Sequence, residues 1–279
     1  MAGTLHVVAT PLGNLDDLSP RARRILAGVA LIACEDTRRT SKLLARFGIE
    51  VPTIALHKFS EAARLAAVVE ALAAGRDVAL VSDGGTPGIS DPGARLVAAA
   101  HAAAIRVSPV PGPSAVVALL SASGLPADRF VFEGFLPARA GQRRKRLAEL
   151  AAEPRTWVVH EAPHRVRETL GDMADALHDR TIVLGRELTK VHETLLRGTA
   201  AEVRRALGDG DVRGEIAIAV AGFDGTAVRP KAEDPLEVAW SAALGEAGGD
   251  VREALKRASK ALSLGRSELW RRLTERGLA

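Results

Sequence analysis

Short apolar runs alternate with amphipathic segments along the first half of the chain. The apolar runs cover residues 5–9, 29–34, 78–82 and 106–110, and helical patterns cover residues 21–28, 37–47 and 61–74. Ser19 and Pro20 form an N-cap followed by a first-turn proline, and Gly48 and Gly75 follow the next two helical patterns. Such alternation is typical of an α/β layer with a mostly parallel sheet.

The second half repeats the pattern after the Pro- and Gly-rich residues 109–113. Strands are predicted near residues 130–132, 157–160, 181–186 and 215–220, with helices at 116–122, 142–152 and 165–177. A linker-like stretch precedes an Ala- and Leu-rich tail, whose two helices about Leu264 and Gly265 are like a helix-turn-helix. We therefore expect an N-terminal α/β domain (1–112), a second α/β domain (113–224), a linker (225–235) and a small helical tail (236–279).

The amino-acid composition excludes several kinds of functional site. The chain has 279 residues, a net charge of +4, a single cysteine and 3% aromatic residues with no tyrosine. The lone Cys34 excludes a disulfide scaffold and a thiolate-rich metal site, which fits a cytoplasmic location. Few aromatic residues argue against a platform that stacks many bases. No apolar stretch reaches the roughly 18 residues of a membrane span, so we expect no membrane partner.

Positive charge is clustered along the chain. The clusters are Arg21, Arg23 and Arg24; Arg38, Arg39, Lys42 and Arg46; and Arg139, Arg143, Arg144, Lys145 and Arg146. Three such groups favour a polyanionic partner, and the alternative for each is an ordinary solvated helix face.

Two loops that follow predicted strands carry the most distinctive patterns. The first is SDGGTPGISDPG at residues 82–93, and the second is PVPGPSA at residues 109–115. Ligands bind at the carboxyl ends of strands in α/β sheets, and Ser114 stands where a helix N-terminus favours electron-rich ligand atoms. Neither GxGxxG nor GxxxxGK[ST] occurs, which disfavours a dinucleotide fingerprint and a P-loop. The alternative for both loops is a purely structural turn.

The stretch HEAPH at residues 160–164 matches the zinc pattern HExxH in form only. That pattern binds zinc when a helix places both histidines on one face, and Pro163 disfavours a helix here. We therefore predict a strand-to-turn junction and no metal site.

Eight stretches in one order resemble the ribosomal RNA small subunit methyltransferase I family of the tetrapyrrole-methylase class. They read VATPLGNLDDLSPRA, ACEDTRRTSKLL, SDGGTPGISDPG, PVPGPSA, FEGFLP, HEAPHRV, RELTKVHE and RGEIAIAVAG. The resemblance implies the α/β fold of class III S-adenosyl-L-methionine (SAM) methyltransferases, with two α/β domains, a cofactor cleft between them and a small C-terminal helical domain. It also implies a homodimer that methylates the 2′-oxygen of a cytidine in the decoding region of 16S ribosomal RNA, free or within the small subunit.

Site residues follow from the resemblance. It implies that SAM is bound by Pro11, Ser82, Asp83, Thr86, Ile89, Ser114 and Ala115, with His160 and Glu215 as further candidates. Family members usually carry His-Asn-Glu after the third strand. This chain has His57, Lys58, Phe59, Ser60 and Glu61 there, without the Asn.

The reaction places further demands on the chain. A ribose hydroxyl is a weak nucleophile, so a general base or a cation beside it is expected. Glu35 and Lys190 are available for this role, and we select Asp36, Lys42 and Glu187 as the catalytic candidates. RNA phosphates are expected to contact Arg38, Arg39, Arg143, Arg144 and Arg146. The alternatives are a small-molecule methyltransferase acting on a tetrapyrrole and a non-catalytic nucleic-acid-binding protein.

Overall fold

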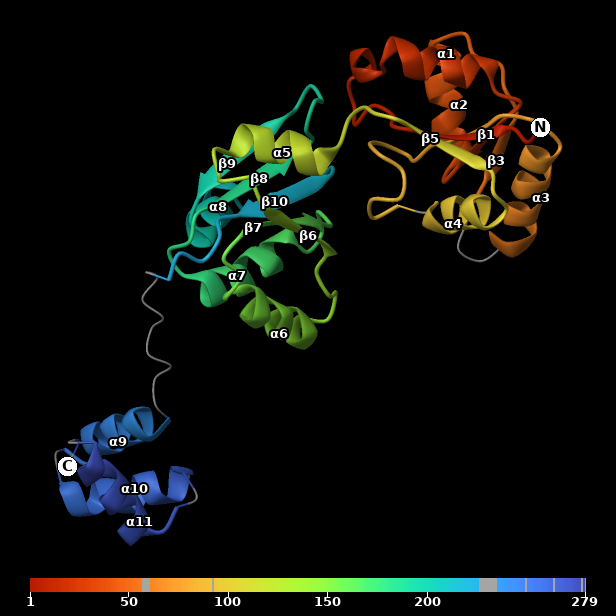
Figure 1. The fold of residues 1–279 in the computed structure, drawn as a ribbon. Coiled ribbons are helices and arrows are strands. Elements are labelled where there is room, and N and C mark those ends of the chain that lie inside the picture. Colours follow the sequence, from red (N-terminus) through yellow and green to blue (C-terminus); the bar gives the residue numbers. More distant parts are fainter. Residues whose placement is uncertain are drawn as a thin grey trace. The chain divides into compact units, whose positions relative to one another are not determined.

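The computed structural model describes residues 1–56, 61–91, 93–225, 235–248, 250–262, 264–276 and 278. These residues form two α/β domains, each built on a five-stranded sheet, and a C-terminal group of helices (Figure 1). The chain divides into two compact units, Met1–Gly225 and Thr226–Ala279. The first unit holds both sheets, and the second unit holds the tail.

The first sheet is parallel throughout and has the order β3-β2-β4-β1-β5. Its strands are β1 (Thr4–Val8), β2 (Leu31–Cys34), β3 (Thr53–Ala55), β4 (Val78–Leu80) and β5 (Arg106–Val110). Its helices are α1 (Pro20–Gly28), α2 (Thr37–Arg46), α3 (Glu61–Ala73) and α4 (Ala94–Ala102), and a short 3-10 turn, η1 (Leu15–Asp17), precedes α1. The parallel α/β layer expected from the sequence is confirmed.

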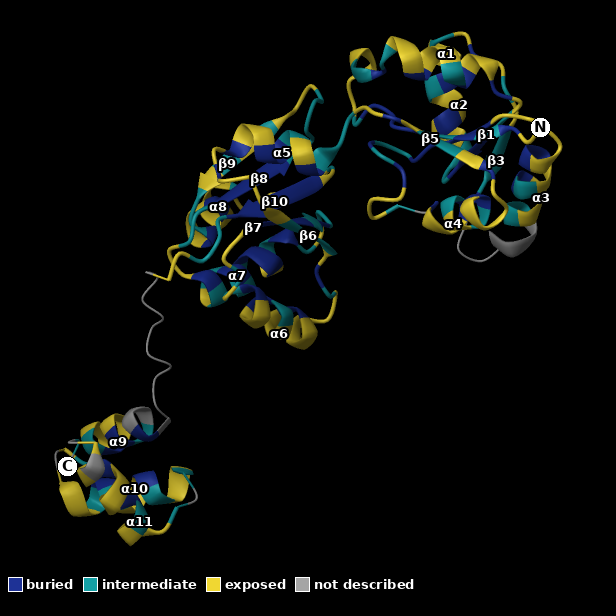
Figure 2. Ribbon diagram, in the orientation of Figure 1, coloured by how far each residue is buried: buried dark blue, intermediate teal, exposed yellow. Residues whose placement is uncertain are grey.

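Alternating side chains of this sheet enter two hydrophobic cores. Ile32 and Ala79 pack in one core with α1 and α2, whereas Ala33 and Leu80 pack in another with α3 and α4. Because successive side chains of a strand point to opposite faces, a strand that is buried on both faces is apolar at every position. This explains why the sequence shows continuous apolar runs at β2 and β4, which are buried along nearly their whole length (Figure 2).

The second sheet is mixed and has the order β6-β7-β10-β8-β9. Its strands are β6 (Phe130–Phe135), β7 (Thr156–Glu161), β8 (Ile182–Arg186), β9 (Thr194–Gly198) and β10 (Ile216–Val220). Only β6 and β7 pair in parallel, and the other three pairings are antiparallel. The helices of this domain are α5 (Ala115–Ser123), α6 (Ala140–Leu150), α7 (Val166–Leu177) and α8 (Ala200–Ala206).

Helices cover both faces of the second sheet as well. Val158 and Val183 pack with α5, whereas Trp157 and Leu184 pack with α6, α7 and α8. The four strands predicted in this half are confirmed, and the sequence pattern missed β9 and α8 here, and β3 and α4 in the first half. β9 is the edge strand and alternates between half-buried and exposed residues, so it lacks the apolar run that marks the others.

The tail unit has a small core of its own. It contains α9 (Pro235–Glu246), α10 (Val251–Leu262) and α11 (Arg266–Glu275). Trp240 packs among small and aliphatic residues of all three helices, and its indole Nε1–H donates to the Leu278 carbonyl at 3.0 Å. The predicted helix break at Leu264 and Gly265 is confirmed.

Two stretches singled out in the sequence lie outside the described residues. They are most of the predicted linker, residues 226–234, and the departure from the family pattern at His57–Ser60. In the part of the chain that is described, no helix combines the length and apolar character needed to cross a bilayer.

Candidate active site

A cavity of about 380 Å³ lies within the unit Met1–Gly225. Its walls come from the loop after β4, the start of α5, the end of β7 with the turn that follows, and the segment that enters β10. The first two wall segments continue from β4 and β5 at the carboxyl edge of the parallel sheet, which is where α/β sheets bind ligands. The volume falls in the range of small-molecule sites.

The loop after β4 is fixed by backbone hydrogen bonds. Thr10 and Gly85 exchange two of them, each 2.9 Å long, which ties the loop to the chain leaving β1. Gly85 has φ 86° and Gly88 has φ 83°, a region that costs glycine nothing and other residues strain. The Thr86 hydroxyl donates to the Pro113 carbonyl at 3.0 Å, so the two distinctive loops of the sequence are bonded to each other.

Most residues expected to bind the cofactor line this cavity. Five of the seven do so: Asp83, Thr86, Ile89, Ser114 and Ala115. Pro11 and Ser82 do not line it but are adjacent in the chain to the lining residues Leu12 and Asp83. Ser82 is buried and its hydroxyl lies 3.3 Å from the Gly85 carbonyl.

His160 and Glu161 reach the cavity from the end of β7, and α7 begins only at Val166. The HEAPH stretch is therefore a strand followed by a turn, as predicted. The His160 ring lies edge-on to Phe132 with ring centroids 5.1 Å apart, and burial lowers the pKa of His160, which keeps the ring neutral at neutral pH.

The Glu161 carboxylate makes its hydrogen bonds within the protein. Its carboxylate accepts from the Arg165 guanidinium, from the Thr169 hydroxyl at 2.6 Å and from the Ala162 N–H at 2.7 Å. These bonds hold the turn after β7 in place against the cavity. No group of three or more candidate metal ligands is found among the described residues.

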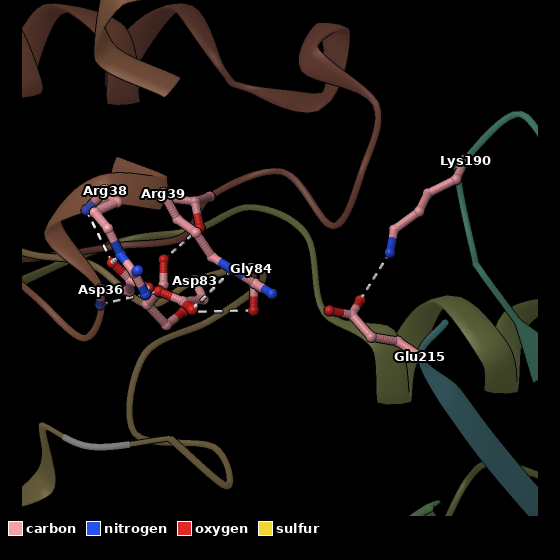
Figure 3. Close-up of polar contacts among 9 residues, drawn as sticks. Asp36, Arg38, Arg39, Asp83, Gly84, Lys190 and Glu215 are labelled. Carbon is pink, nitrogen blue, oxygen red and sulfur yellow. Dashed lines mark hydrogen bonds and ion pairs between the residues drawn. The ribbon is translucent and has the colours of Figure 1, made fainter. Parts of the chain in front are cut away.

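A second polar group stands at the edge of the cavity, on the loop after β8. Lys190 Nζ lies 2.7 Å from Glu187 Oε1. It also lies 3.2 Å from Oε2 of the lining residue Glu215 (Figure 3). Glu187 Oε1 also accepts from the Glu215 N–H at 3.0 Å. Burial raises the pKa of Glu187, but these hydrogen bonds outweigh it, so the net pKa is lowered. Glu187 is therefore ionised at neutral pH.

The loop that carries Glu187 has an unusual backbone and reaches the N-terminal domain. Glu187 has φ 53° and Thr189 has φ 67°, which is rare for a β-branched residue and typical of functional sites. Thr189 Oγ1 accepts from the Asn14 N–H at 3.3 Å. This hydrogen bond ties the loop after β8 to the segment that follows β1.

A third polar group lies beside Asp83 at the start of α2. Asp36 caps this helix and binds Arg38 through both carboxylate oxygens, which holds the pKa of Asp36 well below its usual range. The Asp36 N–H donates to Asp83 Oδ1 at 3.1 Å, and Arg39 Nε lies 3.5 Å from Asp83 Oδ2 (Figure 3). The Arg38 and Arg39 side chains are 87% and 62% exposed, so two accessible cations stand next to a lining residue.

Comparison with known proteins agrees with this arrangement. The family described as Tetrapyrrole (Corrin/Porphyrin) Methylases matches residues 4–204. The chain is 54% identical over 223 residues to ribosomal RNA small subunit methyltransferase I of Xylella fastidiosa, covering 79% of this chain and 82% of that protein. The protein of the same name from Mesorhizobium japonicum is 42% identical over 97% of this chain and 91% of its own. The chain belongs to the ribosomal RNA small subunit methyltransferase I family.

A solved structure supports the fold. Uroporphyrin-III C-methyl transferase from Thermus thermophilus, complexed with S-adenyl homocysteine, superposes with a TM-score of 0.55 at 20% identity, covering 78% of this chain and 97% of that one. The tetrapyrrole methylase fold expected from the sequence is therefore confirmed for this methyltransferase family member.

Of the three catalytic candidates, only Glu187 belongs to the group at the cavity edge. Asp36 is held by Arg38 in a helix cap and reaches Asp83 only through its backbone N–H. Lys42 does not line the cavity and stands instead beside a separate hollow formed with Leu15 and Arg46. Glu35, also a candidate base in the sequence, already interacts with another group of the protein.

The phosphate contact expected at Arg143 is wrong. Its side chain is 2% exposed and lies between two carboxylates of α7, with Nε 2.7 Å from Asp172 and a second nitrogen 3.5 Å from Glu168. Arg143 therefore joins α6 to α7 inside the protein. Reversing its charge would perturb folding and would not test RNA binding.

Two other arginines of the third basic cluster, Arg144 and Arg146, differ from Arg143. Arg144 is exposed and stays a candidate for phosphate contact. Arg146 is bound by Glu133 and Glu149 at 2.6 and 2.7 Å, and these hydrogen bonds raise its pKa. A phosphate would have to displace a carboxylate there.

Sequence reasoning also missed several lining residues of this family member. They are Leu12, Ser90, Asp91, Phe135, Glu161 and Leu188 among others. Asp91 was within a quoted motif and Glu161 within HEAPH, so the signal for both was present. Phe135 and Leu188 also lie within quoted motifs, FEGFLP and RELTKVHE, but as apolar residues they resemble ordinary core positions, so the pattern did not single them out for the cavity wall.

We predict that Arg143→Met lowers the free energy of unfolding by about 3 kcal/mol, because Asp172 is left as a buried charge without its partner. Arg144→Met is the matched control, and its exposed position predicts a change within about 0.5 kcal/mol. Urea denaturation followed by circular dichroism measures both. Equal stabilities of the two variants would contradict the structural role of Arg143.

Proposed function

We propose that this chain transfers the methyl group of SAM to the 2′-oxygen of a cytidine ribose in 16S ribosomal RNA, in the decoding region. The observation that carries the proposal is the 54% identity, over 79% of the chain, to a protein named ribosomal RNA small subunit methyltransferase I. The cavity at the carboxyl edge of the first sheet gives this proposal its site.

The residues around the cavity fit SAM. Ile89, Val116 and Leu188 offer apolar surface to an adenosine, and the first residues of α5 offer N–H groups at a helix N-terminus. Asp83, Asp91 and Glu215 supply negative charge to a sulfonium and an ammonium group. The fold relative from Thermus thermophilus was solved with S-adenyl homocysteine, which agrees with a SAM site in this fold.

When bound, SAM supplies an activated methyl group on a sulfonium. The protein itself must then align the acceptor oxygen and remove its proton. Glu187 Oε1 is occupied by Lys190 and by the Glu215 N–H, which leaves Oε2 as the oxygen that accepts the hydroxyl proton. Lys190 keeps the carboxylate oriented, and its own charge favours the developing alkoxide.

The position of the only cysteine favours an oxygen acceptor over a pyrimidine ring carbon. Methylation of such a carbon needs a nucleophile that first adds to the ring, a role suited to a thiolate. Cys34 is buried in β2, is not a lining residue, and burial raises the pKa of its thiol. A ribose hydroxyl needs no covalent intermediate with the protein.

Phosphate contacts are proposed at Arg38, Arg39 and Arg144, whose side chains are exposed. A phosphate would compete with Asp36 for Arg38 and with Asp83 for Arg39. Arg38 and Arg39 stand beside the lining residue Asp83, so an RNA strand held there lies next to the methyl donor. The homodimer and the cytoplasmic location stay predictions, and sedimentation of the purified protein tests the first.

A tetrapyrrole substrate is the second candidate. It is favoured by the fold relative named uroporphyrin-III C-methyl transferase, but that protein is only 20% identical to this chain. The proteins that are 42 to 54% identical to this chain are instead named for ribosomal RNA, which favours the RNA acceptor.

The direct test is transfer from tritiated SAM to small ribosomal subunits that lack this methylation, with free 16S RNA and a tetrapyrrole offered as acceptors in parallel. A methylated 2′-oxygen cannot attack the adjacent phosphate, so the label must survive alkaline hydrolysis in a dinucleotide that begins with cytidine. Label recovered in a mononucleotide or on a base rejects the 2′-oxygen, and label on a tetrapyrrole alone rejects the RNA substrate.

Glu187→Gln is expected to lower kcat by about 100-fold or more, because the amide cannot accept the proton. The dissociation constant for SAM should stay within about twofold, since the residue is not a lining residue of the cavity. Glu70→Gln, at an exposed position of α3 that does not line the cavity, is the control and should keep normal kcat. A Glu187→Gln enzyme with normal kcat would remove this residue from the mechanism.

Replacing Arg38 and Arg39 together with alanine is expected to weaken RNA binding and to flatten its dependence on salt. Removing one arginine–phosphate ion pair lowers the slope of log K against log salt by about 0.7 to 0.9. Filter binding over a salt series measures the slope, and Arg76→Ala, an exposed residue outside the three basic clusters, is the control. An unchanged slope in the double variant would place the RNA elsewhere.

A further inference from the structure

The cavity wall carries an unbalanced set of charges. Four lining residues are carboxylates, namely Asp83, Asp91, Glu161 and Glu215, and none of the described lining residues is Lys or Arg. His160 also lines the cavity, but its lowered pKa keeps it neutral at neutral pH. The wall is therefore negative.

Three of these carboxylates have a cationic partner. Arg39 Nε lies 3.5 Å from Asp83, Lys190 Nζ lies 3.2 Å from Glu215, and Arg165 binds Glu161. Asp91 differs from them, since in the part of the chain that the structure describes it has no cationic partner.

The groups that face Asp91 make its negative charge costly. The residue is half-buried, and the charged groups near it are Glu35 after β2, Asp83 on its own loop and Glu215 before β10. Burial and the repulsion of Glu35 raise the pKa of Asp91 to about 6, although a hydrogen bond from Ser82 opposes them. An ionised carboxylate in such a place is stabilised by a cationic ligand.

We propose that Asp91 is the residue by which this cavity discriminates the cationic methyl donor from its neutral product. The proposal rests on the proposed function, because it takes SAM and S-adenosylhomocysteine as the two ligands. The donor carries a sulfonium charge, and the product is the same molecule without the methyl group and without that charge. Shape and hydrogen bonding act on both ligands, whereas an uncompensated carboxylate attracts only the extra charge.

This assignment has a consequence for turnover. Loss of the sulfonium charge during transfer removes the attraction to Asp91, so the product is released more readily than the donor. The three compensated carboxylates provide no comparable discrimination, because each already has a cation within about 4 Å.

Calorimetry on the full chain tests the proposal with Asp91→Asn, which keeps the size of the side chain and removes its charge. We expect the dissociation constant for SAM to rise about tenfold and that for S-adenosylhomocysteine to change less than twofold. Asp175→Asn, on the exposed face of α7, is the matched control and should alter neither. Equal weakening of both ligands by Asp91→Asn would overturn the proposal.

The pH dependence gives a second readout. Below pH 6 Asp91 takes up a proton, so the native protein should bind SAM more weakly at pH 5 than at pH 7, with little change for S-adenosylhomocysteine. His160 also gains a proton at low pH, so the effect assigned to Asp91 is the difference between the native protein and Asp91→Asn. Parallel pH profiles for the two proteins would contradict the assignment.

Stability without ligand separates this role from a structural one. Because the folded pKa of Asp91 lies above its unfolded value, its ionisation destabilises the native state as pH rises from about 4 to 6. Asp91→Asn should therefore be at least as stable as the native protein at pH 7 while binding SAM more weakly. A melting temperature that falls together with SAM affinity would indicate a structural role and overturn the proposal.

The same titrations distinguish failure of this proposal from failure of the proposed function. If the native protein binds neither ligand, the SAM site itself is wrong. If it binds both and Asp91→Asn changes them equally, only the discrimination by Asp91 is wrong, and the RNA labelling experiment is unaffected.

Discussion

The paired backbone hydrogen bonds between Thr10 and Gly85 hold the part of the structure on which the cavity depends. They fix the loop after β4 to the chain that leaves β1, and Thr86 then binds it to the turn that starts α5. This loop supplies Asp83, Ile89 and Asp91 to the wall. Without that attachment, a stretch with four glycines would have no single conformation in which to present these side chains.

The cavity also depends on how charge is distributed around it. Carboxylates line it, and the cations that balance three of them stand behind or beside the wall on other segments. This arrangement keeps positive side chains out of a site proposed for a cationic donor. It also leaves Arg38 and Arg39 exposed at the rim, where a polyanionic acceptor is expected.

The arginines of the basic run on α6 lie in three different environments. Arg143, Arg144 and Arg146 lie on one helix, yet the first is buried between Asp172 and Glu168, the second is exposed and the third is bound by two glutamates. Their carboxylate partners lie on β6, α6 and α7, at separations of 3 to 29 residues. The pairings with Glu133, Glu168 and Asp172 depend on how α6 packs against β6 and α7, which local charge patterns do not reveal.

The sequence by itself determined the parallel sheet, four strands of the second sheet, the two distinctive loops and the family, because apolar runs, helix caps and glycine-proline patterns are local signals. It also singled out the loops that carry Asp83, Thr86 and Ser114, which line the cavity, since strand ends share one edge of a sheet. Only the tertiary structure decided that Arg143 is internal, that Lys42 lies away from the cavity and that Glu187 meets Lys190 and Glu215. It also showed that Asp91 lacks the cation its neighbours have in the described chain, because charge compensation is a property of residues that are distant in sequence and close in space.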